Sequence, residues 1–189
     1  MTAQICEQLS YAGITLALAG EPLESWIQSS RHWKIYRFRR RTSANWRGYH
    51  ADWELRDGSL YLVKIWGRLR LFVNHEWVEN THDPLDVLFL DHDGPVLASW
   101  FSGVLRCPYG KLLRYVHLGY SSIHEFDLFF QIIQGRLSRM WMKRNEPPKE
   151  IDDLDIMTAS DAMMDGTRES QFQYDHLPLA WNSTFKKPD

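Results

Sequence analysis

The residues Tyr49–Arg56 alternate strictly between apolar and polar side chains, which is the pattern of a β-strand with one buried face. Asp57-Gly58 follows directly, and this pair readily adopts the positive φ angles of a two-residue hairpin turn. Counting outward from the turn predicts the pairs Leu55 with Leu60, Trp53 with Leu62, Ala51 with Lys64, and Tyr49 with Trp66. The hairpin then has one face that is apolar apart from a lysine stem.

A second extended region is predicted at Val96–Cys107, with Gly103 as a candidate bulge. It ends at Pro108-Tyr109-Gly110, where we expect the chain to turn back. The return strand is then predicted at Leu112–Leu118.

Another hairpin is predicted around Gln134-Gly135, from strands at Phe126–Ile133 and Arg136–Met142. Counting outward from this turn pairs Ile132 with Leu137 and Leu128 with Trp141. Both faces of the hairpin carry apolar side chains, which indicates a central place in the sheet or cover from another element.

Near the start of the chain, Gly13–Leu18 favours a strand and Pro22–Ser29 a short helix. The expected fold class is therefore mainly β, or α+β. We expect an antiparallel sheet built from hairpins, rolled or sandwiched, with one or two short helices.

The charge distribution divides the chain in two. The 189 residues carry a formal charge of -2, but residues 146–189 hold ten acids against four bases. Pro147-Pro148 stands at the border, where a strand or helix cannot continue. We predict a core domain at residues 1–145 and an acidic C-terminal extension at residues 146–189, which packs partly on the core because it still contains apolar residues.

The compartment is predicted to be the cytoplasm. No apolar run approaches the 18 or so residues that cross a bilayer, and no secretory signal pattern is present. The two cysteines, Cys6 and Cys107, are too few for a disulfide framework and form no metal-binding spacing. The sequence therefore predicts no membrane partner, no metal site and no cofactor.

The segment Arg31–Arg41 contains the most conspicuous charge cluster, six bases interleaved with aromatic residues. Such a cluster can bind a nucleic-acid backbone while an aromatic ring stacks on a base. It can equally be an edge strand that arginines keep soluble, or a docking site for the acidic extension. All three interpretations stay open at this point.

Two other clusters contain groups suited to chemistry. His82, Asp83, Asp86 and the run Asp91–Asp93 offer metal ligands, but Asp and Gly are also ordinary turn residues and the spacing fits no metal motif. The segment His117–Asp127 includes Ser121 and His124 and so contains the residue types of a nucleophile and its base.

These residues keep a small hydrolase or transferase open as an alternative function. The segment has no Gly-x-Ser-x-Gly motif. Its alternative interpretation is a turn whose own side chains form its hydrogen bonds. Whether the chain is an enzyme is left open, and a non-catalytic role is preferred.

Nine tryptophans point to packing and to protein recognition. Trp53, Trp66 and Trp141 are expected to pack on the sheet, whereas tryptophan and tyrosine beside arginine are typical of protein-binding surfaces. The candidate binding residues are Trp33, Tyr36, Arg37, Arg39, Arg40, Trp46, Trp77, Trp100, Asp152, Asp153 and Asp155.

The segments Ser43–Tyr49, Leu55–Leu62, Ala98–Arg106 and Gly110–Tyr120 resemble a family of small bacterial proteins of uncharacterised function. The resemblance spans about residues 11–140 and leaves out the acidic extension and the insertion-like stretch Arg70–Pro84. It implies no catalytic residues. Proteins of this kind are similar in size and character to the cytoplasmic immunity proteins that accompany polymorphic toxins.

The sequence thus predicts a non-catalytic, cytoplasmic protein-binding domain, with neutralisation of a toxin as the expected role. The aromatic excess and the opposed charge regions motivate this hypothesis. The alternatives are an enzyme that uses His117, Ser121 or His124, and a nucleic-acid-binding module that uses Arg31–Arg41.

Overall fold

The computed structural model describes residues 2–29 and 32–146 of the chain. These residues form a mainly β fold, which confirms the expected fold class. They include three short helices, one more than the upper number expected. Apart from Glu146, the predicted acidic extension and its packing on the core lie outside the described residues.

Eight strands form the larger sheet. Along the sheet their order is β2 (Ile14–Leu18), β1 (Glu7–Tyr11), β4 (Tyr49–Arg56), β5 (Ser59–Gly67), β11 (Arg136–Arg144), β10 (Ile123–Ile133) and β9 (Gly103–Arg114), with β8 (Val96–Leu97) beside β5. Neighbouring strands are antiparallel except β1 and β4, which run parallel. The sheet is therefore mainly antiparallel, as expected, with one parallel pair that the sequence did not predict.

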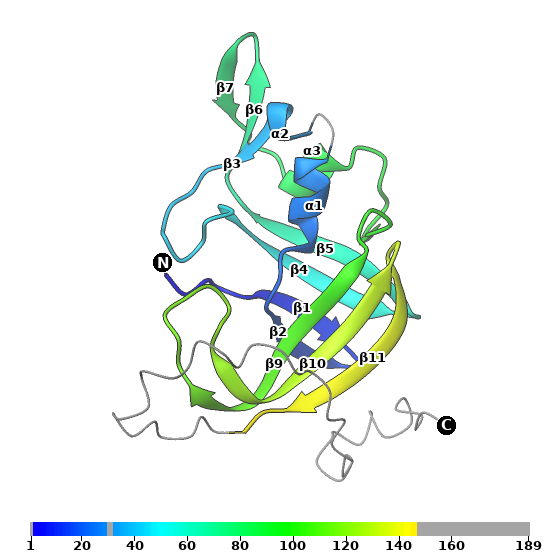
Figure 1. Ribbon diagram of the computed structural model, residues 1–189. Coiled ribbons are helices and arrows are strands. Elements are labelled where there is room, and N and C mark those ends of the chain that lie inside the picture. Colours follow the sequence, from blue (N-terminus) through cyan, green and yellow to red (C-terminus); the bar gives the residue numbers. More distant parts are fainter. Residues whose placement is uncertain (1, 30–31, 147–189) are drawn as a thin grey trace. The chain divides into compact units, whose positions relative to one another are not determined.

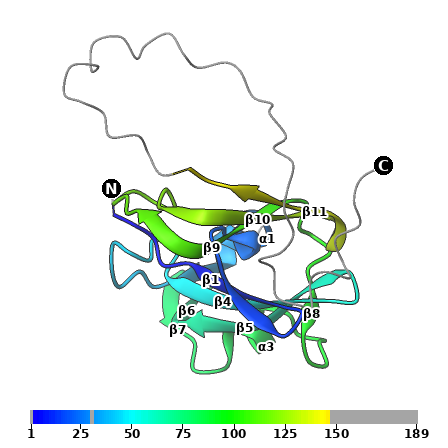
Figure 2. The same ribbon diagram turned by 90° about the horizontal axis from the view of Figure 1, so that it is seen from below.

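The sheet is rolled, so its two end strands approach each other (Figures 1 and 2). The backbone N–H of Ala19, directly after β2, donates to the carbonyl of Arg106 in β9 at 2.8 Å. Apolar side chains from both halves fill the interior between them. The largest that are fully buried are Trp53, Tyr49, Phe130, Leu9, Leu18, Leu23, Leu60, Leu62, Ile65, Leu69 and Leu105.

The β4–β5 hairpin confirms the predicted turn and half of the predicted register. Asp57 and Gly58 have φ angles of 52° and 68°, and the two pairs nearest the turn are those expected. Beyond them Val63 is an extra residue, so Lys64 lies opposite Asp52 and Trp66 opposite His50.

This bulge places Ile65 in the interior in place of Lys64. Lys64 instead lies over the ring of Trp66, which is 51% exposed and donates through Nε1 to Asp52 at 2.8 Å. The bulge therefore keeps a charged group out of the interior. The predicted pairs of Ala51 with Lys64 and Tyr49 with Trp66 are wrong, because counting from a turn assumes a regular ladder.

The β10–β11 hairpin shows the same behaviour. Its turn lies at Gln134-Gly135, and Ile132 pairs with Leu137 as predicted. Ser138 is then an extra residue, so Trp141 lies opposite Phe129 and not opposite Leu128. Because of this shift the two aromatic rings stack at 5.1 Å.

The turn predicted at Pro108-Tyr109-Gly110 is wrong, because β9 passes through all three residues and continues to Arg114. Gly110 has a φ of 81°, and the register against β10 shifts near this point. Proline and a glycine with positive φ are here the marks of a bulge within a strand. The predicted return strand at Leu112–Leu118 is correspondingly absent from the described structure.

Two smaller layers stand at one end of the rolled sheet (Figure 1). The helices are α1 (Pro22–Gln28), α2 (His32–Ile35) and α3 (Pro84–Leu88), and a small antiparallel sheet contains β3 (Tyr36–Phe38), β6 (Leu69–Val73) and β7 (Glu76–Glu79). The β6–β7 hairpin thus takes up much of the insertion-like stretch Arg70–Pro84. Within the described ranges, none of the helices combines the length and the apolar character needed to traverse a bilayer.

Candidate functional site

A hollow of about 770 Å³ lies in the described surface between the helices and the small sheet. We call it the arginine basin, because five arginines and only one acid line it. Its lining residues are Glu24, Ile27 and Gln28 of α1, Trp33 of α2, Tyr36, Arg37 and Phe38 of β3, the following Arg39 and Arg40, then Arg47, and Arg70 of β6.

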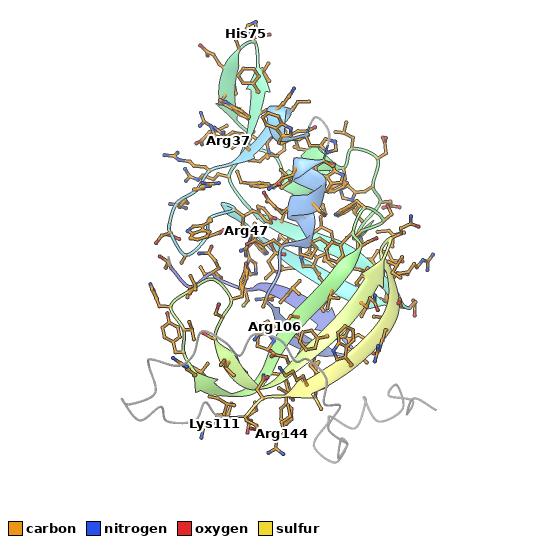
Figure 3. All side chains as sticks on the ribbon, in the orientation of Figure 1. Arg37, Arg47, His75, Arg106, Lys111 and Arg144 are labelled. Atoms are coloured by element: carbon orange, nitrogen blue, oxygen red, sulfur yellow. The ribbon has the colours of Figure 1, made fainter. Side chains whose placement is uncertain are left out.

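Two of the basin arginines are exposed and lack a carboxylate partner. Within the described residues Arg37 and Arg40 form no ion pair. The guanidinium of Arg37 lies 5.1 Å above the ring of Trp77, a cation–π contact that leaves its charge available. Arg39 differs, because it binds Glu79 at 2.9 Å in an exposed pair of small energetic value. The labelled Arg37 lies at the base of the β6–β7 hairpin (Figure 3).

Arg70 contributes a buried donor to the basin. Its Nη2 donates to the carbonyl of Trp77 at 2.9 Å. Its Nε is buried and has no hydrogen-bond acceptor among the described residues. A buried donor without a partner costs about 1–3 kcal/mol.

Arg47 forms the floor of the basin and donates hydrogen bonds through both terminal nitrogens, whereas its buried Nε faces Glu7 without hydrogen-bond geometry. Its side chain is 1% exposed and binds Glu7 at 3.0 Å and Glu21 at 3.3 Å. Nη1 also donates to the Tyr120 hydroxyl at 2.6 Å, and Nη2 donates to the carbonyl of Ile5 at 2.8 Å. Arg47 therefore holds three segments of the chain together.

Glu7 is the most perturbed acid in this network. Burial raises the pKa of its carboxyl to about 8, although Arg47 and a 2.6 Å hydrogen bond from Trp53 Nε1 act in the opposite direction. The pKa of Arg47 is raised, because Glu7, Tyr120 and Glu21 outweigh the effect of its own burial. Burial also raises the pKa of the Tyr120 hydroxyl, which donates to Glu21 at 2.9 Å.

The structure brings together six of the predicted binding residues. Trp33, Tyr36, Arg37, Arg39 and Arg40 line the basin, and Trp77 lies under Arg37. Trp33 is 55% exposed, so its ring is accessible to a partner. This grouping arises because β3 and the residues after it cross the mouth of the basin beside β6.

Other predicted binding residues lie elsewhere. Trp100 is half-buried, stacks on Phe89 at 5.2 Å and donates to the carbonyl of Pro22 at 3.2 Å, so it fixes α1 against the loop after α3. Trp46 is 42% exposed in the loop before β4 and does not line the basin. Asp152, Asp153 and Asp155 lie outside the described residues.

Sequence reasoning missed two of the five basin arginines, Arg47 and Arg70. Arg70 was hidden in the stretch treated as an insertion, although the alternation in Leu69–Val73 and the turn at Asn74-His75 are hairpin signals. Arg47 lies in a loop, and no local pattern shows that Glu7, forty residues earlier in the chain, becomes its partner.

The proposed catalytic cluster is not assembled by hydrogen bonds in the described structure. His117 Nδ1 lies 2.9 Å from the Tyr115 hydroxyl, whereas the backbone N–H of Ser121 donates to the carbonyl of Leu118. Nδ1 of His124 is buried and has no acceptor or donor among the described residues. No hydrogen bond within that part of the chain joins His117, Ser121 and His124.

The acidic and histidine residues around α3 have local roles. Asp83 accepts from the backbone N–H of Leu85 at 2.8 Å and thereby caps the helix. His92 Nε2 lies 3.0 Å from Asp86, and its Nδ1 lies 2.6 Å from the carbonyl of Gly94. Residues 2–29 and 32–146 contain no group of three or more His, Cys, Asp or Glu side chains placed to hold a metal ion.

Comparison with known proteins leaves the geometry as the basis for a functional assignment. No protein-family model matches the chain, and neither a curated protein nor a solved structure matches it significantly.

Proposed function

We propose that this chain is a non-catalytic binding domain that engages an acidic protein partner through the arginine basin. The observation that carries the proposal is the pair of exposed basin arginines, Arg37 and Arg40, which form no ion pair within the described residues, whereas Arg39 and Arg47 already lie against acids. Carboxylates of a partner would supply the missing counter-charge, and guanidinium groups bind carboxylates through two parallel hydrogen bonds.

The aromatic lining supports a protein partner in particular. Trp33 and Tyr36 stand among the arginines of the basin, and tryptophan, tyrosine and arginine are the residues enriched where binding energy concentrates in protein interfaces. A basin of this kind suits an acidic loop or helix that carries an apolar side chain between its acids.

The proposal extends to a class and a compartment. We place the protein in the cytoplasm, which the two free thiols Cys6 and Cys107 support. Immunity proteins are cytoplasmic domains that neutralise a toxin by covering its surface, and we propose this role for the chain on the strength of its resemblance to small bacterial proteins of that character.

The test is affinity capture with the full-length tagged chain and two double variants. Arg37→Glu/Arg40→Glu reverses charge in the basin, whereas Lys111→Glu/Arg114→Glu makes the same charge change on the exposed distant end of β9. In Figure 3 the labelled Arg37 and Lys111 lie at opposite ends of the described core.

A single stoichiometric partner should be recovered with the native chain and with the β9 variant, and lost with the basin variant. The partner is then purified, and its Kd for the basin variant should be at least about tenfold higher than for the native chain. Equal capture by both variants would remove the basin from the proposal.

A nucleic acid is the second candidate ligand, favoured by the exposure of Trp33 beside the same arginines. Single-stranded nucleic acid is bound by stacking on aromatic rings combined with cationic contacts to phosphates. Binding of a fluorescent oligonucleotide should then weaken steeply with salt and weaken further in Trp33→Ala. Binding that is absent at low salt would reject this candidate and leave the protein partner untouched.

A further inference from the structure

The strand β11 lies at an open edge of the large sheet. It pairs with β10 along most of its length, but on its other side only Arg136 has a ladder partner, Ser59 of β5. Beyond this corner no described strand lies beside residues 138–144. The edge follows the outer margin of the sheet in Figures 1 and 2.

The backbone hydrogen bonds at the two ends of β11 identify which of its backbone groups face this edge. The N–H of Asn145 donates to the carbonyl of Glu125 in β10 at 2.8 Å. In an antiparallel ladder every second residue faces the same neighbour, so Arg139, Trp141 and Lys143 direct their backbone groups to β10. Met140, Met142 and Arg144 direct theirs to the open side.

The other end of the strand agrees with this assignment. Leu137 directs its N–H to the carbonyl of Gly58, on the β5 side, at 2.9 Å. The extra residue Ser138 then restores the alternation that the Asn145 bond requires. Met140, Met142 and Arg144 thus present a row of N–H and C=O groups without a described partner strand.

The side chains of β11 give the edge two distinct faces. Trp141 stacks on Phe129 on the outer face, and Arg139 lies over the Trp141 ring. Met140 and Met142 lie opposite the buried Phe130 and Leu128, so they share the inner face. An added strand would meet cations on one face and flexible apolar side chains on the other.

The charge of the edge indicates which kind of protein segment would bind there. The strand contains four bases, Arg136, Arg139, Lys143 and Arg144, and no acid. None of the four forms an ion pair within the described part of the chain. Like charges on an edge strand oppose its pairing with a second copy, whereas acids on an added strand would lie beside Arg139 and Lys143.

We propose that the open edge of β11 binds an extended segment of a partner protein by strand addition, and that this segment alternates acidic with apolar residues. Backbone bonds to Met140, Met142 and Arg144 would provide the pairing, as in other cases of β-augmentation. The acids would face Arg139 and Lys143, and the apolar residues would cover Met140 and Met142. The inference stands independently of the arginine basin.

The experiment uses the full-length chain labelled with ¹⁵N and a synthetic capped peptide, Thr-Glu-Val-Thr-Val-Glu-Thr, at about 1 mM, the weak end of specific recognition. Amide hydrogen exchange is measured for each residue of β11. The peptide should slow exchange at Met140, Met142 and Arg144 by at least about twofold, the factor expected when half of the chain is bound. The amides of Trp141 and Lys143 already bond to β10 and should change little.

Two control peptides separate strand addition from charge attraction. Replacing both glutamates by lysine should abolish the protection. A peptide of the original sequence with N-methyl groups on every residue lacks amide donors on both edges, so it should also give no protection. Protection by the lysine peptide would overturn the charge assignment, and protection by the N-methylated peptide would overturn strand addition.

Variants of the chain complete the test. Arg139→Glu/Lys143→Glu should lose the protection, whereas the basin variant Arg37→Glu/Arg40→Glu, with the same charge change, should keep it. Met142→Pro removes the outward N–H of residue 142 and breaks no hydrogen bond to β10. Circular dichroism confirms that each variant folds. Slow exchange at Met140 and Met142 in the chain without peptide would overturn the proposal, because the edge would already be covered.

Discussion

The buried carboxyl of Glu7 makes the stability of the fold depend on pH in a direction that can be worked out. Its folded pKa of about 8 exceeds its ordinary value of 4.5, because the side chain is fully buried. Between these two values the native state holds a proton that the unfolded state has lost. Stability from this site is therefore complete below about pH 4.5 and is lost as the pH rises towards 8.

The size of the effect follows from the same interval. Each pH unit between the two pKa values corresponds to about 1.4 kcal/mol, so the free energy of unfolding should lose up to ~5 kcal/mol from this site. Glu7→Gln keeps the size of the side chain and its acceptor for Trp53 Nε1, but it cannot ionise. The stability of this variant relative to the native chain should rise steadily from pH 4.5 to 8.

The assay is urea unfolding followed by tryptophan fluorescence at half-unit pH steps, with Glu76→Gln on the exposed strand β7 as the control. The control should give a curve parallel to that of the native chain. The reasoning is refuted if the Glu7→Gln chain loses stability relative to the native chain as the pH rises. That result would mean that Arg47, at 3.0 Å, outweighs burial and holds Glu7 ionised.

Three further predictions concern stability and reactivity. Gly135→Ala should destabilise the fold by about 2–4 kcal/mol in thermal unfolding, since the φ of Gly135 is 76° and a Cβ there would lie 2.9 Å from the backbone of Ala98. The control Gly58→Ala should lose only about 1 kcal/mol, because Gly58 has a φ of 68° but open space around it. Arg106→Lys should lower the free energy of unfolding in urea by about 1–3 kcal/mol, because one ammonium group cannot replace the three hydrogen bonds to Asp127 and to the carbonyls of Tyr120 and Ser122. An unchanged midpoint of urea unfolding would contradict this. Burial strongly raises the pKa of the Cys107 thiol, so Cys107 should react with iodoacetamide at pH 8 only after unfolding. If mass spectrometry finds Cys107 alkylated in the native chain, the strand opens locally.

Local patterns predicted the elements whose signal is local. The alternation in Tyr49–Arg56 and the turns at Asp57-Gly58 and Gln134-Gly135 are found as expected, because period-two burial and positive φ angles are properties of a few adjacent residues. The strand at Glu7–Tyr11 was missed, although it forms a hairpin with β2 as well as pairing in parallel with β4. Only the pairing with β4, about forty residues away in the chain, leaves no trace in a local pattern.

In the candidate site, too, some residues are predictable from local sequence and others only from tertiary contacts. The cluster Arg37–Arg40 is visible in the sequence because its bases are adjacent, and it does line the basin. Arg70 comes from a hairpin treated as an insertion, and Arg47 becomes the floor only through contacts with Glu7, Glu21 and Tyr120. The sequence therefore predicted the rim of the basin, while its depth depends on tertiary contacts that bring distant segments together.

The bulge at Val63 lets one more prediction separate local pattern from tertiary packing. If Val63 is removed, Leu62 and Lys64 become neighbours, and Leu60, Leu62 and Ile65 still face inward in a regular alternation. Deletion of Val63 should therefore leave a folded chain that loses less than about 2 kcal/mol in thermal unfolding. Deletion of Glu54 from the regular strand β4 should prevent folding, because it turns Trp53 and Ala51 to the opposite face. Near-ultraviolet circular dichroism of the buried Trp53 distinguishes the two outcomes. If both deletions unfold the chain, the bend that the bulge gives to β5 is itself required to roll the sheet.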